Sequence, residues 1–471
     1  MTAVDLMGLA ASRPVHFIGV GGAGMYPLAE LVLRTGGRVS GCDVRESAAT
    51  RRLEELGADV RIGHDPSHVA DVSAVVASSA VPSRHPEIEA ARARGLPVLK
   101  RAEAMAGLVH RGRVVAVAGT HGKTTTTAMI ASVLTAGGLD PTALVGGAVP
   151  EWDGHLRLGR PDVYVVEADE YDRSFHELRP DAAVVTNLDA DHLDVFGDLE
   201  GVRDAFRTFV GGARPGARIA VCADDPEASR LLGLLPVAGY GYGLSAGSQL
   251  RAVDVTSDAE GTRCRVFEEG RDAGELVVRV AGLHNLRNAL GASVIGRYFG
   301  VSWDAVREGL RGFTGVARRL QRVGEVDGVL VIDDYAHHPT EIEATLAAVR
   351  MGNPGRRLVA LFQPHLYSRT RDFADAFGRV LAAGSDVVWV TDVYPAREKP
   401  IPGVTGQTVA DAVRRHGGNQ IVVRYHPPLE GLASALADEL RPGDVIVSMG
   451  AGSVEGVPAE LTRRLGEVAR A

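Results

Sequence analysis

A glycine-rich segment with a lysine and consecutive threonines, GTHGKTTTT at residues 119–127, has the residue types of a phosphate-binding loop. It lies between a valine-rich run and a stretch of helical periodicity, so its backbone amides and the helix dipole can surround an anion. Lys123 can reach the outer phosphates of a nucleotide, and the Thr124 hydroxyl can bind Mg²⁺. The spacing departs from G-x-x-x-x-G-K-[ST], because Val117 stands five residues before Gly122. We therefore predict an ATP loop shorter than that of ordinary P-loop ATPases. The predicted loop residues are Gly119, Thr120, His121, Gly122, Lys123, Thr124 and Thr125.

An acidic residue and a histidine end the two strand-like runs that follow this loop. Glu167 stands near the end of DVYVVEADE, and His192 ends AAVVTNLDADH. In a parallel sheet both side chains would project at the carboxyl edge, where the phosphate loop also lies. Oxygen ligands suit Mg²⁺, so Glu167 is the natural ligand, whereas His192 is explained equally well as a structural histidine. Asp169 and Glu170 either position the surroundings of the metal or are solvated, and the aspartates of the second run are interpreted as turn or cap residues.

A second glycine turn, G-x-G-x-x-G, follows the apolar run VHFIGV near the start of the chain. Its glycines allow a tight turn, a close approach of the backbone to a diphosphate, and a helix N-terminus that faces the anion. Asp43 comes about twenty residues later, where a carboxylate can bond a ribose or a base. The motif alone does not distinguish NAD from a UDP-sugar, and a turn needed only for packing is the simpler alternative. The predicted residues are Gly19, Gly21, Gly22, Ala23, Gly24 and Asp43.

Single charged residues flank predicted strands in the last third of the chain. Arg319 precedes a strand and Asp334 ends one, so an arginine could clamp a phosphoryl group and a carboxylate could bind a ribose. Arg369 follows the run RLVALFQPH, where a guanidinium can hold a substrate carboxylate. Charges of this kind are also common on protein surfaces, and both interpretations remain open at this point.

Two polar clusters are also open to two interpretations. His284, Asn285 and Asn288 stand at a predicted helix start, where they either read an adenine edge or cap the helix. His337 and His338 precede a proline, so they either contact a ligand or form the turn that enters a helix.

These motifs can meet only if parallel sheets bring them to a common edge. The sequence pattern predicts such sheets. Valine-rich runs alternate with alanine- and leucine-rich stretches of helical period along the 471 residues, which is typical of repeated βα units. Three such blocks meet near residues 107 and 318, and the later half of the second block is strand-rich. The main predicted strands are 15–20, 38–44, 113–120, 162–170, 182–192, 329–335, 357–365, 386–394 and 444–452, with helices over 25–33 and 123–136.

Composition narrows the class of protein. Lys and Arg number 51 against 59 Asp and Glu, a net charge of −8, so nucleic acid is a poor candidate partner. Hydrophobic residues at 45% suffice for several cores. Three separate cysteines with no C-x-x-C pair are too few for a disulfide scaffold or a cysteine-based zinc site. Because there is no signal-peptide pattern and no apolar run of about 18 residues, we expect a cytoplasmic protein without membrane insertion.

Taken together, the motifs resemble those of the Mur ligases of peptidoglycan synthesis along nearly the whole chain. The matching segments are HFIGVGGAGM, GTHGKTTTT, EADE, TNLDADHLD, GLHNLRNAL, RRLQ, DDYAHHPTE and FQPHLYSRT, in the family's order. The resemblance implies an α/β fold in three domains. These are an N-terminal Rossmann-like domain for a UDP-sugar (1–107), a central P-loop ATPase-like domain with a mostly parallel sheet (108–317), and a C-terminal Rossmann-like domain that closes on ATP and the amino acid (318–471).

The resemblance also implies a reaction. Within the family, the segments are similar to those of members that join L-alanine to the lactyl carboxylate of UDP-N-acetylmuramate through an acyl phosphate. The implied cofactors are ATP and Mg²⁺, and the expected partners are the two substrates alone, bound by a monomer or weak homodimer. A sister enzyme that joins a ready-made tripeptide to the same sugar nucleotide is the nearest alternative. An NAD-dependent oxidoreductase and an ATP-driven switch protein are more distant ones, and the first of these leaves the second phosphate loop unexplained.

Residue roles follow from the same resemblance. Lys123 would hold the β and γ phosphates, Thr124 and Glu167 would bind one Mg²⁺, and His192 would bind a second. The expected catalytic set is Lys123, Glu167, His192 and Arg319. The expected adenine contacts are His284, Asn285 and Asn288, the ribose contact is Asp334, the diphosphate cradle is Gly21 to Gly24, and the amino-acid contact is Arg369. The chain departs from the family pattern at Leu366, where many alanine-adding members have arginine, and at Tyr171, where serine is common; we expect no carbamylated lysine.

Overall fold

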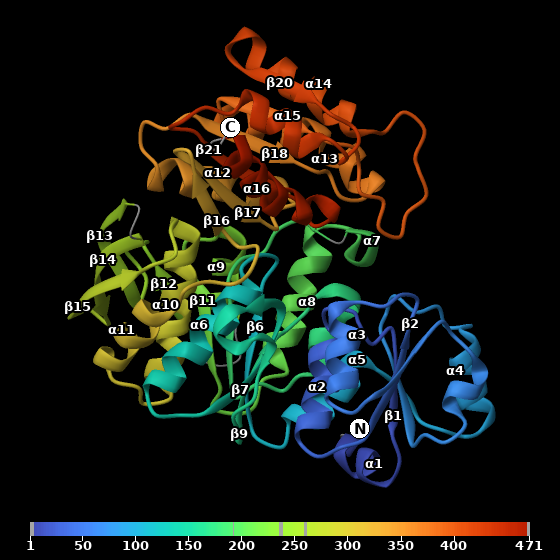
Figure 1. Ribbon diagram of the computed structural model, residues 1–471. Coiled ribbons are helices and arrows are strands. Elements are labelled where there is room, and N and C mark those ends of the chain that lie inside the picture. The colour runs from blue at the N-terminus through green and yellow to red at the C-terminus, as the bar shows by residue number, and fades with distance from the viewer. Residues whose placement is uncertain (1–3, 192, 235–238, 259–260, 469–471) are drawn as a thin grey trace. The chain divides into compact units, whose positions relative to one another are not determined.

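The computed structural model describes residues 4–191, 193–234, 239–258 and 261–468, and its strands form three sheets in which most neighbours run parallel (Figure 1). The chain forms two compact units. The first comprises residues 1–253, 265–274 and 287–312, and the second comprises 254–264, 275–286 and 313–471. The α/β class predicted from the sequence is confirmed. No helix in the described part of the chain is long and apolar enough to cross a membrane.

The first sheet has five parallel strands in the order β3-β2-β1-β4-β5. Every residue of β1 is buried, because helices cover both faces of the sheet. Helices α2, α3 and α5 lie on one side of β1 and β2, and α4 lies on the other (Figure 1). The strands are β1 (Val15–Ile18), β2 (Val39–Asp43), β3 (Asp59–Ile62), β4 (Ala74–Ala77) and β5 (Val98–Lys100). The helices are α1 (Leu6–Ser12), α2 (Tyr26–Arg34), α3 (Ala48–Glu55), η1 (Pro66–Val69), α4 (Pro86–Ala93) and α5 (Arg101–Val109).

The second sheet has ten strands in the order β15-β14-β13-β12-β11-β10-β6-β9-β7-β8, with β6 between β9 and β10. Side chains of α8 and α9 pack on one face of its centre, whereas α6, α10 and α11 pack against one another. The strands are β6 (Arg113–Ala118), β7 (Pro141–Val149), β8 (Gly154–Arg157), β9 (Arg160–Glu167), β10 (Ala182–Val185), β11 (Arg218–Cys222), β12 (Gly239–Gly243), β13 (Leu250–Asp258), β14 (Gly261–Glu268) and β15 (Arg271–Val278). The helices are α6 (Lys123–Ala136), η2 (Pro150–Trp152), η3 (Tyr171–Glu177), α7 (Leu193–Phe196), α8 (Leu199–Gly211), α9 (Pro226–Leu232), α10 (Leu283–Tyr298) and α11 (Trp303–Gly312).

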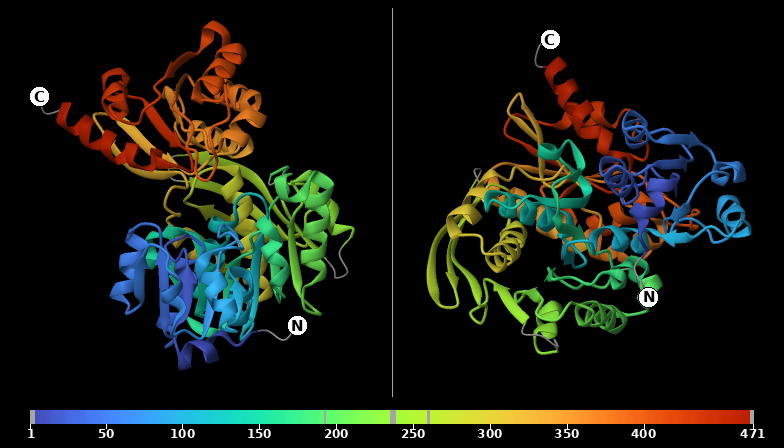
Figure 2. Two further views of the ribbon diagram at one scale, coloured as in Figure 1. Left: turned by 90° about the vertical axis from the view of Figure 1, so that its right-hand side faces the viewer. Right: turned by 90° about the horizontal axis from the view of Figure 1, so that it is seen from below.

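The third sheet has the order β16-β17-β21-β18-β19-β20, with β16 antiparallel to β17 and the other pairs parallel. Helices α12, α13 and α14 pack on one face, and α15 and α16 pack on the other (Figure 2, left). The strands are β16 (Gln321–Val326), β17 (Val329–Asp334), β18 (Leu358–Phe362), β19 (Val387–Val390), β20 (Val422–Tyr425) and β21 (Val445–Met449). The helices are α12 (Pro339–Gly352), α13 (Tyr367–Gly384), α14 (Gly406–Gly417), η4 (Gly418–Gln420), α15 (Leu432–Glu439), η5 (Ser453–Gly456) and α16 (Val457–Val468).

Candidate nucleotide-binding and active site

The phosphate loop connects the end of β6 to the first residue of α6, Lys123. Gly119 and Gly122 have φ values of +139° and +84°, a region that side-chain-bearing residues rarely adopt. A Cβ on Gly119 would overlap the Thr186 hydroxyl, and one on Gly122 would lie 2.8 Å from Asn288 Oδ1. Both positions therefore require glycine for two reasons, the backbone conformation and the lack of space.

The segment that follows β10 supports this loop. The backbone of His121 donates to Asn187 Oδ1 over 2.8 Å, and its carbonyl accepts from the Thr186 hydroxyl at 2.6 Å and the Asn187 amide at 3.0 Å. The backbone amide of Asp189 donates to Thr120 Oγ1 over 2.9 Å. These contacts fix the loop before any ligand binds, which lowers the cost of ordering it. Sequence reasoning did not single out Asn187 and treated Asp189 as a turn residue; the available signal was that TNLD directly follows a strand adjacent to β6.

Lys123 lies in a strongly acidic setting at the start of α6. Its Nζ donates to the carbonyl oxygens of Gly119 at 2.6 Å and Thr120 at 3.2 Å, and it forms an ion pair with Glu170 at 2.7 Å. Burial alone lowers the pKa of Lys123, but the charges of Glu170, Asp169 and Glu167 outweigh it, and the pKa is raised. Lys123 is therefore a fixed cation at the phosphate loop.

Glu167 ends β9 next to the strand that leads into the loop, and Val117 of β6 pairs with it in register. Its Oε1 accepts from the Gly146 backbone amide over 2.5 Å. Thr124 and Thr125, in the first turn of α6, are nearly buried. A carboxylate and a hydroxyl at this edge are the oxygen donors that Mg²⁺ prefers, so Thr124 and Glu167 fit that ion. The predicted ligand His192 lies outside the described residues.

The first glycine turn contacts Asp43, for which the sequence predicts only a bond to a ribose or a base. The backbone amide of Gly21 donates to Asp43 Oδ2 over 2.9 Å, so one role of this carboxylate is to hold the turn. A Cβ on Gly24 would lie 3.2 to 3.3 Å from the Arg101 side chain. Arg101 in turn forms an ion pair of 3.1 Å with Asp169, two residues after Glu167. Arg101 was not among the sequence predictions, yet it connects the glycine turn with the acidic segment around Lys123.

The polar residues of HNLRN occupy the first two turns of α10. Asn285 donates to the Ala281 carbonyl over 2.8 Å, so its amide contributes to the start of this helix. Asn288, one turn later, lies against Gly122 of the phosphate loop, which agrees with a contact to bound nucleotide. His284 packs near Gly282, whose φ is +102°. Asn285 thus contributes to the helix start, and a contact of Asn285 or Asn288 with an adenine stays a prediction.

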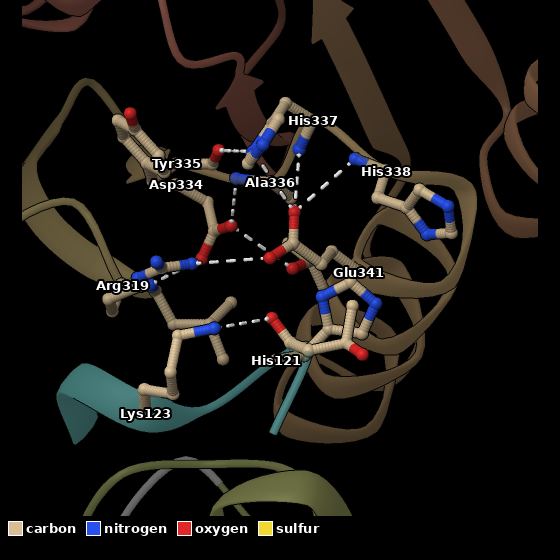
Figure 3. Close-up of polar contacts among 12 residues, drawn as sticks. His121, Lys123, Arg319, Asp334, Tyr335, Ala336, His337, His338 and Glu341 are labelled. Atoms are coloured by element: carbon tan, nitrogen blue, oxygen red, sulfur yellow. Dashed lines mark hydrogen bonds and ion pairs between the residues drawn. The ribbon is translucent and has the colours of Figure 1, made fainter. Parts of the chain in front are cut away.

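Arg319 and Asp334 come together at the end of β17 in the second unit. Asp334 is 4% exposed and accepts from the backbone amides of Leu320 at 2.7 Å and Ala336 at 2.8 Å. Burial raises the pKa of Asp334 even though Arg319 and these amides lower it. Glu341 accepts from the backbone amides of His337 and His338 (Figure 3). Its carboxylate lies 3.7 Å from the Arg319 guanidinium. The Asp334 carboxylate therefore has a structural role in its own loop besides any contact with a ribose.

Arg369 lies in the first turn of α13, and 9% of it is exposed. The preceding Leu366 has φ +66°, and this backbone conformation redirects the chain from β18 into the helix. His365 stacks on Tyr394, and its ring lies 5.8 Å from that of His337. Burial and the positive charges of His337, Arg369 and Arg397 lower the pKa of His365 to about 4. A neutral histidine and a nearly buried arginine can hold a small carboxylate.

The predicted residues fall into the two compact units. The glycine turn, Asp43, the phosphate loop, Glu167 and Asn288 belong to the first unit. His284, Asn285, Arg319, Asp334 and Arg369 belong to the second.

Two nucleotide-type glycine turns on separate, mostly parallel sheets, with a fixed lysine and a carboxylate at the second, define a multidomain ATP-binding α/β enzyme. The profile of "Mur ligase family, catalytic domain" matches residues 14–113, "Mur ligase middle domain" matches 117–296, and "Mur ligase, glutamate ligase domain" matches 318–452. The chain belongs to the Mur ligase family, and the resemblance stated from the sequence is confirmed. It is an ATP-dependent, amide-forming ligase.

Individual relatives agree with this assignment. The UDP-N-acetylmuramate–L-alanine ligase of Burkholderia ambifaria is 44% identical over 459 residues, which is 96% of this chain and 98% of the relative. The crystal structure of UDP-N-acetylmuramate-alanine ligase from Thermotoga maritima matches with 28% identity and a TM-score of 0.82, covering 97% of this chain and 100% of that one. A murein peptide ligase from Psychrobacter arcticus matches with 25% identity and a TM-score of 0.69, covering 96% and 99%.

Proposed function

We propose that the protein joins L-alanine to the lactyl carboxylate of UDP-N-acetylmuramate, converting ATP to ADP and phosphate and yielding UDP-N-acetylmuramoyl-L-alanine. The observation that carries the proposal is the ordered phosphate loop with Lys123 fixed among three carboxylates, in a chain 44% identical over 96% of its length to a ligase of that name. We further propose a cytoplasmic location, because ATP and sugar nucleotides are cytoplasmic metabolites. We propose that the protein is a monomer or a weak homodimer.

The chemistry follows from the charges at the site. The lactyl carboxylate attacks the γ-phosphate of ATP, which gives an acyl phosphate and ADP. The neutral amine of alanine then attacks the acyl carbon, and the tetrahedral intermediate collapses with loss of phosphate. Several anionic oxygens must converge in the first step, so the main task of the protein is to offset their repulsion. Lys123 supplies a positive charge at the β and γ phosphates, and Arg319 supplies a second at the transferred group.

Magnesium fits the donor set of the phosphate loop. In this proposal Thr124 and Glu167 would hold one Mg²⁺, and His192 would hold a second. The ions supply positive charge that neutralises the phosphate oxygens. Glu167 is also held by the Gly146 amide, so its carboxylate needs little reorganisation to accept a cation.

The remaining assignments complete the proposed site. The domains are 1–107 for the UDP-sugar, 108–317 for ATP and 318–471 for closure on ATP and the amino acid. The proposed ATP contacts are Gly119 to Thr125, His284, Asn285, Asn288, Arg319 and Asp334. The proposed UDP-sugar contacts are Gly19, Gly21, Gly22, Ala23, Gly24 and Asp43, and Arg369 binds the carboxylate of alanine. Exclusion of water during closure would protect the acyl phosphate from hydrolysis.

The deciding experiment measures phosphate release with ATP, Mg²⁺ and UDP-N-acetylmuramate, with L-alanine present or omitted. The mass of the sugar nucleotide is determined in parallel by mass spectrometry. We expect phosphate release coupled to a product heavier by one alanyl residue. A Lys123→Met enzyme prepared in parallel accounts for contaminating ATPases. Hydrolysis of ATP that does not depend on the sugar nucleotide, or joining of a tripeptide in place of alanine, contradicts the proposal.

A further inference from the structure

Five potential metal ligands gather around one buried carboxylate, Glu87, in the first domain. Glu87, at the start of α4, is completely buried. His16 comes from β1, Cys42 from β2 and His68 from η1, while His64 and His85 come from the flanking loops. The cluster lies on the α4 face of the sheet, and no step of the proposed ligase reaction uses it.

The distances within the cluster are short. Glu87 Oε1 lies 2.8 Å from His68 Nδ1, and Glu87 Oε2 lies 3.0 Å from Cys42 Sγ and 3.6 Å from His16 Nε2. One ligand atom from each of His16, Cys42, His68 and Glu87 falls within 4.8 Å of every other. Ligands about 2.0 to 2.3 Å from a tetrahedral Zn²⁺ stand roughly 3.3 to 3.8 Å from one another. The four atoms therefore need only small shifts to surround such an ion.

His16 supplies an independent sign of a missing ligand. Its Nδ1 contacts the Ser40 hydroxyl at 3.0 Å, which leaves Nε2 as the atom directed toward Glu87. The residue is only 1% exposed, and Nε2 has no hydrogen-bond partner in the described part of the chain. A buried imidazole nitrogen without a partner is costly, and a bound cation would satisfy it.

We propose that His16, Cys42, His68 and Glu87 form a binding site for Zn²⁺ or a similar thiophilic divalent cation. The donor set of two imidazoles, one thiolate and one carboxylate is the mixture that zinc accepts and that Mg²⁺ does not. His64, whose Nδ1 lies 3.2 Å from Cys42 Sγ, packs against His85 on the more exposed side and can take part in loading the ion.

The thiol and the carboxylate of the cluster differ in how readily they ionise. Burial and the adjacent Glu87 carboxylate raise the pKa of the Cys42 thiol well above its usual range. Burial also opposes ionisation of Glu87, but the nearby His16, the Cys42 thiol and the Asp65 amide outweigh it and lower its pKa to about 2. Binding of zinc would displace the proton of the Cys42 thiol.

The site would act on the glycine turn through the backbone. The Cys42 carbonyl accepts from the amides of Gly19 at 2.8 Å and Val20 at 3.0 Å, and the next residue, Asp43, holds the Gly21 amide. A metal bound to Cys42 therefore anchors the strand that supports this turn. Loading with zinc should raise the melting temperature of the protein.

Cobalt(II) is the probe that tests the site, because coordination by a thiolate gives it an intense charge-transfer band in the near ultraviolet. The full-length protein is stripped with a chelator and titrated with Co²⁺ in the absence of nucleotide. The phosphate loop cannot contribute this band, because its metal ligands are oxygen atoms and not thiolates. We expect one equivalent of tightly bound Co²⁺, displaced by Zn²⁺, with the band and a d–d spectrum typical of tetrahedral coordination. Absence of the band in the wild-type protein overturns the proposal.

The three cysteines offer matched controls. Cys222→Ser with Cys264→Ser leaves Cys42 as the single thiol, and this protein should keep the full band, which assigns it without altering the site. Cys42→Ser should lose the band, and His68→Gln should weaken Co²⁺ binding at least 10-fold, in line with the loss of a ligand. A band that disappears from the double variant, or persists in Cys42→Ser, rejects the site. If Cys42→Ser does not fold, the double variant still decides.

Discussion

Lys123 and Glu170 form an ion pair of 2.7 Å at the phosphate loop, with 16% and 4% of their side chains exposed. The lysine side chain also donates to two loop carbonyls, so its ammonium group is held in one place by the end of the acidic segment EADE. Breaking a buried pair by removing one partner is strongly destabilising, because the other charge remains buried. Glu170 is therefore a positioning residue for Lys123 in the proposed reaction.

The first prediction concerns this ion pair. Lys123→Met should lower kcat by ~10³-fold, because it removes a charge that stabilises the transferred phosphoryl group. Glu170→Gln should lower kcat by about 10-fold and raise KM for ATP, because Lys123 keeps its charge but loses its fixed position. Glu177→Gln is the matched control, since Glu177 is exposed in the following helical turn, and it should behave as wild type. Steady-state kinetics with varied ATP measures all three, and equal activities of the two glutamine variants would contradict the positioning role.

The second prediction separates backbone strain from a steric conflict. Gly122 and Gly138 have φ values of +84° and +81°, but a Cβ on Gly138 meets nothing within 4 Å whereas one on Gly122 meets Asn288. Alanine at either position should lower the free energy of unfolding by about 1 to 2 kcal/mol. Gly122→Ala should in addition raise the Kd for ATP at least 10-fold, measured by calorimetry. Equal ATP affinities of the two variants would show that the loop tolerates a side chain at Gly122.

The sequence predicts those parts of the site whose contacts lie close together along the chain, and it does not predict contacts between residues far apart in sequence. The helix predicted over 123–136 is observed over those residues, because a glycine turn, a lysine and an apolar helical pattern are local signals. The support of the loop by Asn187 and the Lys123–Glu170 pair depend on β9, β6 and β10 lying side by side, which only the folded sheet establishes. The hairpin of β7 and β8 escaped prediction since its glycines weaken the strand pattern.

The cluster around Glu87 in the first domain could not be predicted from the sequence for the same reason. Three cysteines without C-x-x-C spacing argue against a cysteine-based zinc site, and the structure brings no two of them together. The histidines and Glu87 that surround Cys42 are spread between residues 16 and 87, on elements whose neighbours in space are distant in sequence. No spacing rule for a metal site covers such a set, because the sheet order β2-β1-β4 assembles it.

The third prediction distinguishes two adjacent arginines. Arg318 bonds Asp333 at 3.2 Å, Glu455 at 3.0 Å and the Gly450 carbonyl at 2.5 Å. Arg319 forms a looser ion pair of 3.7 Å with Glu341 and interacts electrostatically with Asp334. Arg318→Ala should therefore destabilise the protein by about 3 kcal/mol, since Asp333 stays buried without its cation. Arg319→Lys should leave the melting temperature within about 2 °C of wild type yet lower kcat ~10²-fold, because a lysine cannot reproduce a bidentate contact with a phosphoryl group. Calorimetric melting and phosphate-release kinetics test both, and a large loss of stability in Arg319→Lys would assign this residue to the fold.

The fourth prediction concerns acid stability and His365. Its pKa is about 4 in the folded protein and 6.5 ordinarily, so the unfolded chain takes up the proton first as the pH falls. The stability that a neutral His365 contributes is fully present above about pH 6.5 and declines down to about pH 4, by up to about 3 kcal/mol. His365→Gln cannot bind this proton, so its free energy of unfolding should fall less steeply between these pH values, as measured by urea unfolding at several pH values. Titration of the His365 ring by NMR checks the cause directly, and a midpoint near 6.5 in the folded protein would refute the explanation.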